Sequence, residues 1–525
     1  MIEAPREIEL KLELTADALK RLKTAPAPAG FSVERARTRV LRSIYFDTPD
    51  MALRRAKWSL RVRKVGTDWI QTVKAGTGVR GGLSTPKESE TRVEAPAPDL
   101  TRIVDPALRD GLWGLLGGAP LSAVFETEMR RTTRVFRAEP ATVIEVALDS
   151  GEVRTLERAL PLHEAEFELV EGRVEHLFGL ARDLRGTAEA RFSGASKAQR
   201  GYALLAGEEA DIAPKNAGSV TFSPENDTAG SAFQTILRSC LDQIATNREA
   251  SLALDAPEGP HQMRVGLRRL RSALKIHRKH LPDDRAATLD AQARDLAARV
   301  GALRDLDVLA GEIVASAGHS APDGIDLERL RNIVLDEREN ARAVLRDQLR
   351  DPAVNALLFD LGAMAQGTLV PPDADDDTED DKAAAALAAP VTAFAAQALE
   401  KRWKAVSRLG AHLDELSLEE RHDMRKALKK LRYAIEFYKS LYKKKSVKPF
   451  LSTLKKLQDV FGYLNDVVMA HRLADLLRAR DTVEGDDMLA VGFVIGWHER
   501  RAEIEWERAR ALWDDTRHAR KFWRD

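Results

Sequence analysis

The spacing of the apolar residues changes near residue 205, and this change limits what the chain can fold into. Before it, short segments such as 7–14, 59–64 and 164–170 alternate polar and apolar residues by twos. Alternation of this kind, broken by Gly, Pro and Asp, is typical of antiparallel strands. From Ser231 onward the apolar residues recur at helical spacing instead. The sequence therefore predicts a multi-domain α+β protein, strand-rich in its N-terminal part and all-α afterwards.

Composition places the boundaries between these parts. The stretch 206–230 is rich in Ala, Gly, Ser, Asp and Pro and has no periodicity, which is typical of a linker. Within the helical part, the acidic stretch 371–381 indicates an exposed loop. The predicted segments are a strand domain over 1–205, the linker 206–230, a helical domain over 231–525 with repeats at about 231–365 and 390–525, and an acidic loop over 366–389.

The helical part contains an internal duplication. His261-Gln-Met263-Arg264 recurs as His422-Asp-Met424-Arg425, an offset of 161 residues. At the same offset Leu303-Arg304-Asp305 meets Leu464-Asn465-Asp466. A constant offset over this length predicts two copies of one helical unit, related by pseudo-two-fold symmetry.

Bulk composition excludes several classes of protein. Lys plus Arg and Asp plus Glu are both 82, so net charge favours neither an acidic nor a basic partner. Cys240 is the only cysteine, which excludes a disulfide framework and a Cys-based metal site. No apolar run approaches the roughly 20 residues that span a bilayer. Met1–Arg6 lead into a charged strand pattern without the apolar core of a signal peptide. We therefore expect a cytoplasmic protein without a membrane partner.

Ionisable residues gather on one face of nearly every predicted strand. Residues two apart in a strand share a face, so Glu7, Glu9, Lys11 and Glu13 project to one side. The same parity groups Arg61 with Arg63, Thr72 with Lys74, Arg92 with Glu94, Glu145 with Asp149, and Glu164 with Glu166 and Glu168. One explanation is a set of solvated sheet faces. The other is a closed barrel with a charged lumen, which a divalent metal and a polyanion would neutralise.

These motifs resemble a known family. Glu7-x-Glu9-x-Lys11 is similar to the ExExK signature of the CYTH superfamily, the triphosphate tunnel metalloenzymes. Further motifs follow in family order: Tyr45-Phe46-Asp47-Thr48, Leu60-Arg61-Val62-Arg63, Gln71-Thr72-Val73-Lys74, Arg92-Val93-Glu94, Glu145–Asp149, Glu164-x-Glu166-x-Glu168 and Ser196–Tyr202. The resemblance covers about residues 1–205. It implies an antiparallel eight-stranded tunnel β-barrel that hydrolyses or rearranges triphosphates with Mg²⁺ or Mn²⁺.

The resemblance also implies roles for individual residues. The metal ligands would be Glu7, Glu9, Asp149, Glu166 and Glu168. The phosphates would be held by Lys11, Arg61, Arg63, Lys74, Arg92, Arg131 and Lys197, with Arg131 favoured over Arg130. The catalytic set would be Glu7, Glu9, Lys11, Glu166 and Glu168, acting in an in-line attack of metal-activated water. Glu166 and Glu168 are both candidates for the general base.

Each helical repeat carries a basic helix face. His261, Arg264, Arg268, Arg271 and Lys275 step by three and four residues, as do His422, Arg425, Lys429 and Arg432. Met263–Lys279 contains seven basic residues and no acidic one, so a solvated face with paired charges is a poorer explanation than an anion site. We expect each His to begin its helix, where free N–H groups hold phosphate. A capping or core role for the His residues is the alternative.

The duplicated motif resembles the CHAD domain, the conserved-histidine α-helical domain, over about residues 225–525. The resemblance implies a helical bundle with a basic groove that binds inorganic polyphosphate. Asp305 and Asp466 are expected to pair with the Arg residues of the repeats instead of touching the ligand.

The leading hypothesis is hydrolysis of inorganic triphosphate to pyrophosphate and phosphate, with polyphosphate binding by the helical domain and association with polyphosphate granules. Alternatives are a CYTH adenylyl cyclase, a thiamine triphosphatase, or a non-catalytic polyphosphate-binding protein. A cyclase or a thiamine triphosphatase needs an aromatic site for an organic group, and Trp58 and Trp69 are the residues left without a role. Sequence-specific nucleic-acid binding is not expected, because the basic helices lack interleaved aromatics.

Overall fold

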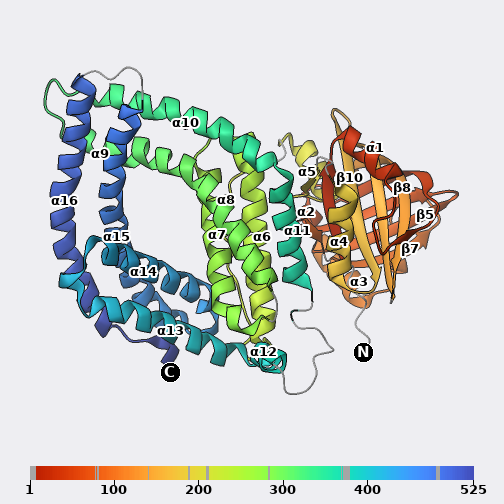
Figure 1. The fold of residues 1–525 in the computed structure, drawn as a ribbon. Helices are drawn as coiled ribbons and strands as arrows, with labels where there is room; N and C mark the ends of the chain where they lie inside the picture. Colours follow the sequence, from red (N-terminus) through yellow and green to blue (C-terminus); the bar gives the residue numbers. More distant parts are fainter. Residues whose placement is uncertain are drawn as a thin grey trace. The chain divides into compact units, whose positions relative to one another are not determined.

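The chain forms two compact units in a computed structural model (Figure 1). The model describes residues 8–76, 79, 82–84, 86–139, 141–186, 190–208, 212–281, 284–367, 369, 379–479 and 485–524. The first unit is Met1–Ala213 with Asn355–Thr368, and the second is Pro214–Val354 with Leu369–Asp525. Named strands occur in the first unit, and the described part of the second unit is helical. This confirms the predicted fold class.

The first unit is built on one antiparallel sheet. Eight strands have six or more residues: β1 (Glu9–Leu14), β3 (Arg37–Asp47), β4 (Trp58–Val65), β5 (Asp68–Ala75), β7 (Lys87–Val93), β8 (Ser122–Ala138), β9 (Thr142–Arg154) and β10 (Ala159–Glu171). Three shorter strands are β2 (Ser32–Val33), β6 (Leu83–Ser84) and β11 (Ala190–Phe192). The prediction of eight principal strands is confirmed.

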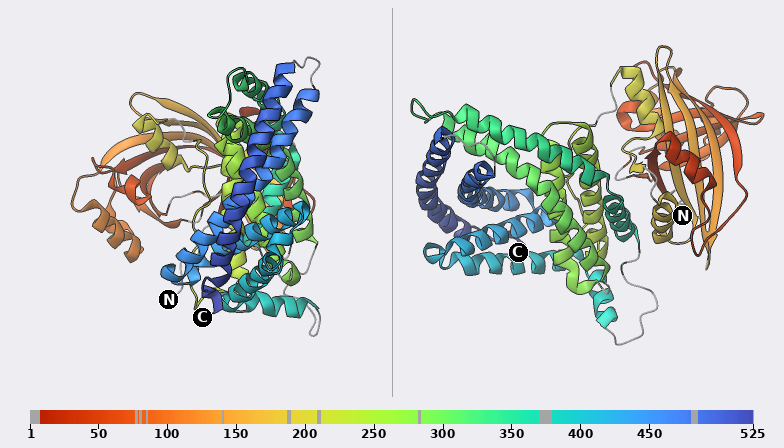
Figure 2. Two further views of the ribbon diagram at one scale, coloured as in Figure 1. Left: turned by 90° about the vertical axis from the view of Figure 1, so that its left-hand side faces the viewer. Right: turned by 45° about the horizontal axis from the view of Figure 1, so that its top comes forward.

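The strand order brings the two ends of the sheet together. It runs β11-β1-β10-β9-β8-β3-β4-β5-β7, with β2 on β8 and β6 on β1. The short β6 pairs with β1, while β7, which begins a few residues later, pairs with β5 at the other end of the path. The sheet therefore curls round on itself, as the two views of Figure 2 show.

Both faces of the curled sheet are buried along β10. Along β10, Ala165 and Phe167 lie on one face and Glu164 and Glu166 on the other, and all four are less than 9% exposed. The apolar face is covered by α1 (Ala16–Thr24) and α4 (Val174–Arg185), which contact β9 and β10. The charged face therefore lines the inside of the curl. The unit also contains α2 (Ala52–Ala56), η1 (Leu100–Arg102), α3 (Pro106–Leu116), α5 (Lys197–Ala206) and most of α11 (Pro352–Gln366).

The second unit repeats one helical arrangement. Its first half has α6 (Ala229–Ala253), α7 (Glu258–His277), η2 (Arg278–His280), α8 (Arg285–Val308), the π-helical η3 (Leu309–Val314), α9 (Ala315–Gly318) and α10 (Leu327–Arg350). The second half has α13 (Val391–Gly410), η4 (Leu413–Glu415), α14 (Leu418–Tyr438), η5 (Lys439–Leu441), α15 (Lys444–Arg478), α16 (Gly485–His518) and η6 (Phe522–Arg524). Between the halves lie α11 (Pro352–Gln366) and α12 (Glu379–Ala388).

Equivalent residues of the two halves meet at the centre of this unit. His277 and Tyr438 are 161 positions apart, the same offset as the sequence repeat, and the Tyr438 hydroxyl lies 3.4 Å from His277 Nε2. Phe233 and Phe394, again 161 apart, flank the His277 ring at 4.3 and 4.7 Å between ring centroids. Contact between equivalent positions is the arrangement expected at a pseudo-two-fold axis.

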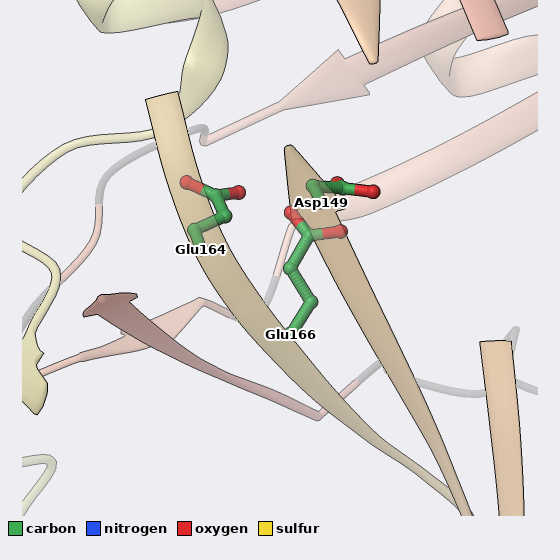
Figure 3. Close-up of side chains that lie close together, drawn as sticks. All are labelled: Asp149, Glu164 and Glu166. Carbon is green, nitrogen blue, oxygen red and sulfur yellow. The ribbon is translucent and has the colours of Figure 1, made fainter. Parts of the chain in front are cut away.

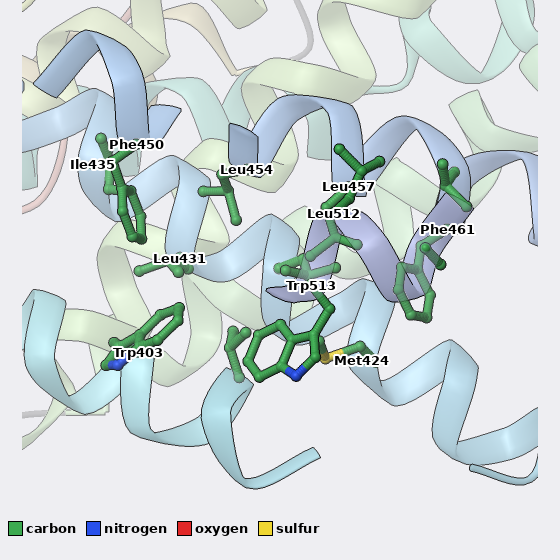
Figure 4. Close-up of a cluster of buried hydrophobic side chains, with 14 of the residues drawn as sticks. Trp403, Met424, Leu431, Ile435, Phe450, Leu454, Leu457, Phe461, Leu512 and Trp513 are labelled. Carbon is green, nitrogen blue, oxygen red and sulfur yellow. The ribbon is translucent and has the colours of Figure 1, made fainter. Parts of the chain in front are cut away.

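Apolar packing holds the second half together. Trp403, Phe450 and Trp513 lie in one buried cluster with Leu residues of α14 and α15 (Figure 4). The Trp403 and Trp513 rings stack at 5.9 Å between centroids.

Membrane-spanning helices are not found in the described part of the chain, because no helix there is both long enough and apolar enough to cross a bilayer.

Two segments between the repeats differ from the prediction. The expected acidic loop over 366–389 contains helix α12, because Lys382–Ala388 is rich in Ala, a strong helix former. In addition, Asn355–Thr368, which covers the end of the expected first repeat and the start of the expected loop, groups with the strand-rich unit.

Candidate active site

A cavity of about 460 Å³ lies inside the curled sheet. Each of the eight long strands contributes to its lining, and the N-terminal end of α5 contributes Ser196, Lys197 and Ala198. Nine residues predicted to bind metal or phosphate line it: Glu9, Lys11, Arg61, Arg63, Lys74, Arg131, Glu166, Glu168 and Lys197. These nine residues were predicted to lie on the charged faces of their strands or at the start of a helix, and in the structure they line the cavity.

Strand register sets the neighbours within the cavity. On β1 and β10, Glu9 lies opposite Glu168 and Lys11 opposite Glu166. On the opposite edge of β10, Glu168 lies opposite Glu145 of β9. Side chains directly opposite in an antiparallel pair have Cβ atoms about 4.5–5.5 Å apart. The lining is therefore ordered into rows that cross the strands.

Lys11 is fixed between two carboxylates. Its Nζ lies 2.8 Å from Glu9 Oε1 and 2.6 Å from Glu166 Oε1. Burial opposes the charge on Lys11, but Glu166 and Glu9 outweigh it and raise the lysine pKa above its ordinary value. Lys11 therefore stays protonated and is held at a defined position in the cavity.

Arg131 and Lys197 neutralise the deepest carboxylate. Arg131 makes two parallel hydrogen bonds to Asp149, at 2.8 and 2.7 Å, and Lys197 Nζ lies 2.8 Å from Asp149 Oδ2. Burial by itself would raise the pKa of Asp149, but Lys197 and Arg131 lower it to about 2. Arg131 lines the cavity and Arg130 is exposed and is not among the lining residues, which supports the preference for Arg131.

Helix α5 delivers Lys197 to this site. Ser196 caps the helix, its side chain accepting from the Gln199 amide while Gln199 accepts from the Ser196 amide. Lys197 is the first residue of the helix and is 7% exposed. Its Nζ also contacts Glu164 and lies 2.9 Å from Glu166 Oε1.

Asp149, Glu164 and Glu166 form one group of carboxylates, shown in Figure 3. A ligand oxygen from each lies within 4.8 Å of the others. Burial raises the pKa of Glu164 to about 7 despite Lys197, and Glu164 Oε2 is buried without a hydrogen-bond partner. Glu164 is absent from the predicted ligand set, although strand parity put it on the face of Glu166 and Glu168. Lys11, Arg131 and Lys197 already neutralise much of the negative charge of these three carboxylates.

A second group of carboxylates is less neutralised. Glu9, Glu168 and Glu145 are direct neighbours across three strands, and all line the cavity. Burial, Glu9 and Glu145 together raise the pKa of Glu168. These three carboxylates offer the hard oxygen ligands that Mg²⁺ and Mn²⁺ prefer, whereas among the described residues the oxygens that lie within 4.8 Å of one another are those of the first group.

The predicted metal ligands thus divide between two groups. Glu9 and Glu168 belong to the less neutralised one, and Asp149 and Glu166 to the ion-paired one. Glu145 was not predicted as a ligand, although its motif and its parity with Asp149 were visible in the sequence. Glu7 lies outside the described residues.

An arginine pair dominates the other side of the cavity. Arg61 Nη2 lies 3.8 Å from Glu90, and Arg61 Nε is buried without a hydrogen-bond partner. Arg63 donates to Ser43 Oγ at 3.2 Å. Burial, Arg61 and Arg131 lower the pKa of Arg63 to about 10. Mutual repulsion between buried cations favours binding of an anion between them.

Two predicted phosphate ligands lie differently from this pair. Lys74 lines the cavity and forms an ion pair with Glu88 on the adjacent strand. The side chain of Arg92 is 70% exposed and pairs with Asp68. Arg92 follows Glu88 and Glu90 on the same strand face but is not among the residues that line the cavity, because β7 leaves the cavity before it reaches Arg92.

The cavity lining offers little to an organic group. Tyr45 is the one aromatic residue among the described lining residues, and its ring stacks on Phe125 at 4.5 Å between centroids. Trp58 packs against α3, where a Cβ at Gly111 would lie 2.8 Å from its ring. Trp69 lies beside Lys64. Neither tryptophan lines the cavity.

The basic faces of the helical unit are more neutralised than the sequence analysis expected. Arg264 pairs with Asp305 at 2.9 Å, and Arg271 pairs with Asp290 at 2.8 Å. Lys275 lies 3.9 Å from the same Asp290. The expectation of unrelieved repulsion was wrong because the acids come from α8, not from α7 itself. Pairing of Asp305 with an Arg of the repeat is confirmed.

The second copy of this face shows the same feature. Arg432 pairs with Glu436 at 2.7 Å and donates to Gln458 at 3.2 Å. Arg425 and Lys429 are half-buried on the same helix. The side chain of Asp466 lies outside the described side chains.

The predicted position of the two His residues at helix starts was wrong. Helix α7 begins at Glu258, so the His261 amide already donates to the Pro257 carbonyl at 3.1 Å. Helix α14 begins at Leu418, four residues before His422. Each His lies beyond the first turn, where free N–H groups are used up by the helix.

Family models match both halves of the chain. The CYTH domain matches residues 5–202 and the CHAD domain matches residues 235–475. The chain therefore consists of a CYTH domain followed by a CHAD domain, in agreement with the strand-lined cavity and the duplicated helices.

Individual relatives cover one half each. The inorganic triphosphatase of Haemophilus influenzae is 32% identical over 202 residues, 38% of this chain and 55% of that protein. The chain thus spans about half the length of this relative. The crystal structure of a CHAD domain from the plant Ricinus communis is 28% identical, with a TM-score of 0.49, and covers 57% of this chain and 96% of that one. A Pyrococcus horikoshii protein is 19% identical, with a TM-score of 0.25, over 38% of this chain and 99% of its own.

Proposed function

We propose that the CYTH domain hydrolyses inorganic triphosphate to pyrophosphate and phosphate with a divalent metal ion. The observation that carries the proposal is the separation of charge in one cavity. A row of three carboxylates, Glu9, Glu145 and Glu168, of which Glu9 pairs with Lys11, lies on one side, and the half-buried Arg61 and Arg63 lie on the other. A linear polyanion and a divalent cation together would neutralise both sides. The relative named inorganic triphosphatase supports the same substrate.

The residues of the cavity have distinct parts in this reaction. Arg61 and Arg63 bind the oxygens of the phosphate chain, and the Arg fork favours two parallel contacts. Lys11 and Arg131 provide further positive charge at fixed positions. Glu9, Glu145 and Glu168 would hold Mg²⁺ or Mn²⁺, which when bound lowers the pKa of water and offsets phosphate charge. Because phosphoryl transfer needs mainly positioning and charge neutralisation, these groups are sufficient in kind.

The lining also favours an inorganic substrate over a nucleotide or thiamine triphosphate. A base or thiazole ring needs a stacking surface, and Tyr45, the aromatic residue of the described lining, already stacks on Phe125. We therefore rank adenylyl cyclase and thiamine triphosphatase activity below inorganic triphosphate hydrolysis. A non-catalytic role is ranked below it as well, because Glu9, Glu145 and Glu168 remain close enough to repel one another and raise the pKa of Glu168.

Phosphate release from triphosphate, pyrophosphate, ATP, thiamine triphosphate and long polyphosphate tests this proposal, with Mg²⁺ and with Mn²⁺. Glu168→Gln should lower kcat on triphosphate at least a hundredfold, since a lost ligand weakens the metal site. Glu34→Gln is a matched control, because Glu34 is half-exposed and pairs with Arg137 on the surface. Full activity of Glu168→Gln on triphosphate would contradict the proposed metal site.

We also propose that the CHAD domain binds inorganic polyphosphate, through His261, Arg264, Arg268, Arg271 and Lys275 and the matching His422, Arg425, Lys429 and Arg432. One feature of the first face supports this. Burial is the main cause that lowers the pKa of His261, and Arg304 and Arg268 near the ring lower it further against the opposing effect of Glu258. Arg268 Nε is also buried without a hydrogen-bond partner. A protein that binds polyphosphate in this way would associate with polyphosphate granules in the cytoplasm.

Binding of long-chain polyphosphate at fixed salt tests the second proposal, with duplex DNA as competitor because any phosphate backbone attracts a basic groove. Arg268→Glu should weaken binding more than tenfold, and Arg500→Glu, at an exposed position of α16, should not. Equal binding by Arg268→Glu and wild type would exclude this face. Displacement by equal amounts of DNA would favour a nucleic-acid site.

A further inference from the structure

Helix α11 has no separate helix as its equivalent in the duplication. In chain order α6 corresponds to α13, α7 to α14, α8 to α15 and α10 to α16. The offset of 161 places the start of α11, Pro352, at residue 513, within α16. Helix α11 is therefore an addition to the repeat, and the part of it from Asn355 onward groups with the strand-rich unit.

Specific contacts attach α11 to that unit. The Phe359 and Phe192 rings lie 4.9 Å apart between centroids. A Cβ at Gly362 would lie 2.3 Å from the Phe178 ring, so this position needs a glycine for the helix to approach α4 closely. Asp360 Oδ1 accepts from Arg182 Nη1 at 3.0 Å. Phe359 is 2% exposed and Phe192 is 7% exposed, so the aromatic contact is a buried one.

Phe192 connects this contact to the active site. It lies in β11, opposite Leu12 of β1, and the next residue, Ser193, donates its amide to the Lys11 carbonyl at 2.9 Å. On the same edge of β1, which is the edge not paired with β10, the Lys11 amide donates to the Gly82 carbonyl at 2.7 Å. A Cβ at Gly82 would lie 2.3 Å from the Phe192 ring, so the ring packs directly over Gly82. Both backbone partners of Lys11 are thus adjacent to Phe192 or in contact with it.

We infer that α11 is a positioning element of the active site and that Phe359 acts through Phe192 on Lys11. Phe359 holds Phe192 against Gly82 and β1, which fixes both backbone partners of Lys11 on this edge. Lys197 follows Phe192 by five residues and is placed by the same stretch of chain. Val354 and Leu369, on either side of the segment, belong to the second unit. A helix that follows the first helical repeat in the chain therefore supports the strand that carries Lys11, and triphosphate turnover depends on this helix.

The test uses the full chain. Phe359→Ala should speed hydrogen–deuterium exchange at the amides of Lys11 and Ser193 and lower kcat/KM on triphosphate roughly tenfold, because small misplacements of catalytic groups are costly. Phe359→Leu, which keeps most of the apolar volume, should restore both. Phe450→Ala is the matched control, because Phe450 is a 1% exposed phenylalanine in the apolar core of the second unit. It should lower stability without changing exchange at Lys11.

A double substitution separates positioning from general destabilisation. If Phe359 acts through Phe192, the effects of Phe359→Ala and Phe192→Ala on kcat/KM are far from additive. Where Phe359→Ala gives too little folded protein, Gly362→Ala displaces the same helix by its clash with Phe178. Unchanged exchange at Lys11 and Ser193 in Phe359→Ala and Gly362→Ala would overturn the inference, and so would additive effects.

The inference about turnover rests on the proposed triphosphatase function, but the exchange measurement does not. A wild-type chain without activity on triphosphate would remove the proposed function. Comparing hydrogen–deuterium exchange of that wild-type chain with exchange of Phe359→Ala would still show whether α11 holds β1 in place.

Discussion

At the scale of single residues, Lys197 determines how much charge the cavity can hold. Its Nζ contacts Asp149, Glu164 and Glu166, and the three carboxylates are less than 9% exposed. Removing one partner of a buried ion pair leaves the others without compensation, which is more costly than the pair is stabilising. Lys197 is therefore a requirement for folding as well as a candidate phosphate ligand.

Lys197→Met should lower the free energy of unfolding at pH 7 by about 3–5 kcal/mol. Lys20→Met, at an exposed pair with Asp17, should change it by less than about 0.5 kcal/mol. Urea denaturation measures both. Equal small effects of the two variants would show that the buried carboxylates do not depend on Lys197.

Asp149 should contribute to the fall in the free energy of unfolding at acidic pH. Its pKa is lowered to about 2, so the folded state binds this proton less readily than the unfolded chain. The stabilisation is complete above about pH 4, the ordinary pKa of Asp, and is lost as pH falls toward 2. Asp149 should contribute about 2 kcal/mol of this loss. Urea midpoints between pH 5 and pH 2 should fall less steeply for Asp149→Asn than for wild type, and parallel curves would contradict this.

At the scale of elements, the N-terminal end of α5 forms part of the cavity lining. It crosses Phe125 at Gly201, where a Cβ would lie 2.1 Å from the ring. The same helix positions Lys197 at its first residue. A larger residue at 201 must therefore push the helix, and Lys197 with it, away from β8.

Gly201→Ala should lower the free energy of unfolding by about 1–3 kcal/mol, as overpacking does, and should reduce triphosphate turnover. Gly179→Ala in α4 is the matched control, since no atom lies within 4 Å of a Cβ there. That change should be neutral or stabilise by about 0.5–1 kcal/mol, because Ala favours helix over Gly. Thermal unfolding and phosphate release measure both, and a Gly201→Ala protein like wild type would exclude tight packing of α5.

The elements also show which parts of the fold can be predicted from the local pattern of the sequence. Alternation by twos found β1, β4, β5, β7, β9 and β10, because each buries one apolar face. It missed most of β3 and β8. In β8, Arg130, Arg131, Thr132 and Thr133 form a polar run on both faces: Arg130 is exposed, Thr132 is buried, and Arg131 lines the charged cavity. Alternation of apolar and polar residues disappears where both faces are polar.

At the scale of the whole molecule, the two units should respond to different ligands. Triphosphate with Mg²⁺ at a hundred times its Kd should stabilise the CYTH unit by about 2.7 kcal/mol, and long polyphosphate should stabilise the CHAD unit. Differential scanning calorimetry should show two transitions that shift independently. A single transition that moves with either ligand would show that the units unfold together.

Long-range contacts were the part that the sequence analysis did not predict. Asp290 and Asp305 on α8 neutralise cations on α7 that looked unpaired when their own helix was considered alone. Likewise, nothing in the local pattern of 355–368 distinguishes a helix that packs on Phe178 from one that packs within its own repeat. The Glu9–Glu168–Glu145 row is intermediate: parity gave the face, but only strand order made these residues neighbours.

The pair of His277 and Tyr438 has a consequence for how the helical half can change over time. In a dimer of two identical copies, a residue on the two-fold axis meets its own kind, so a change there alters both sides of the contact at once. Joining the copies in one chain removes that restriction. A hydroxyl then faces an imidazole nitrogen, a complementary pair that no symmetric dimer can place on its axis. Positions on the axis are therefore where the two halves are free to specialise.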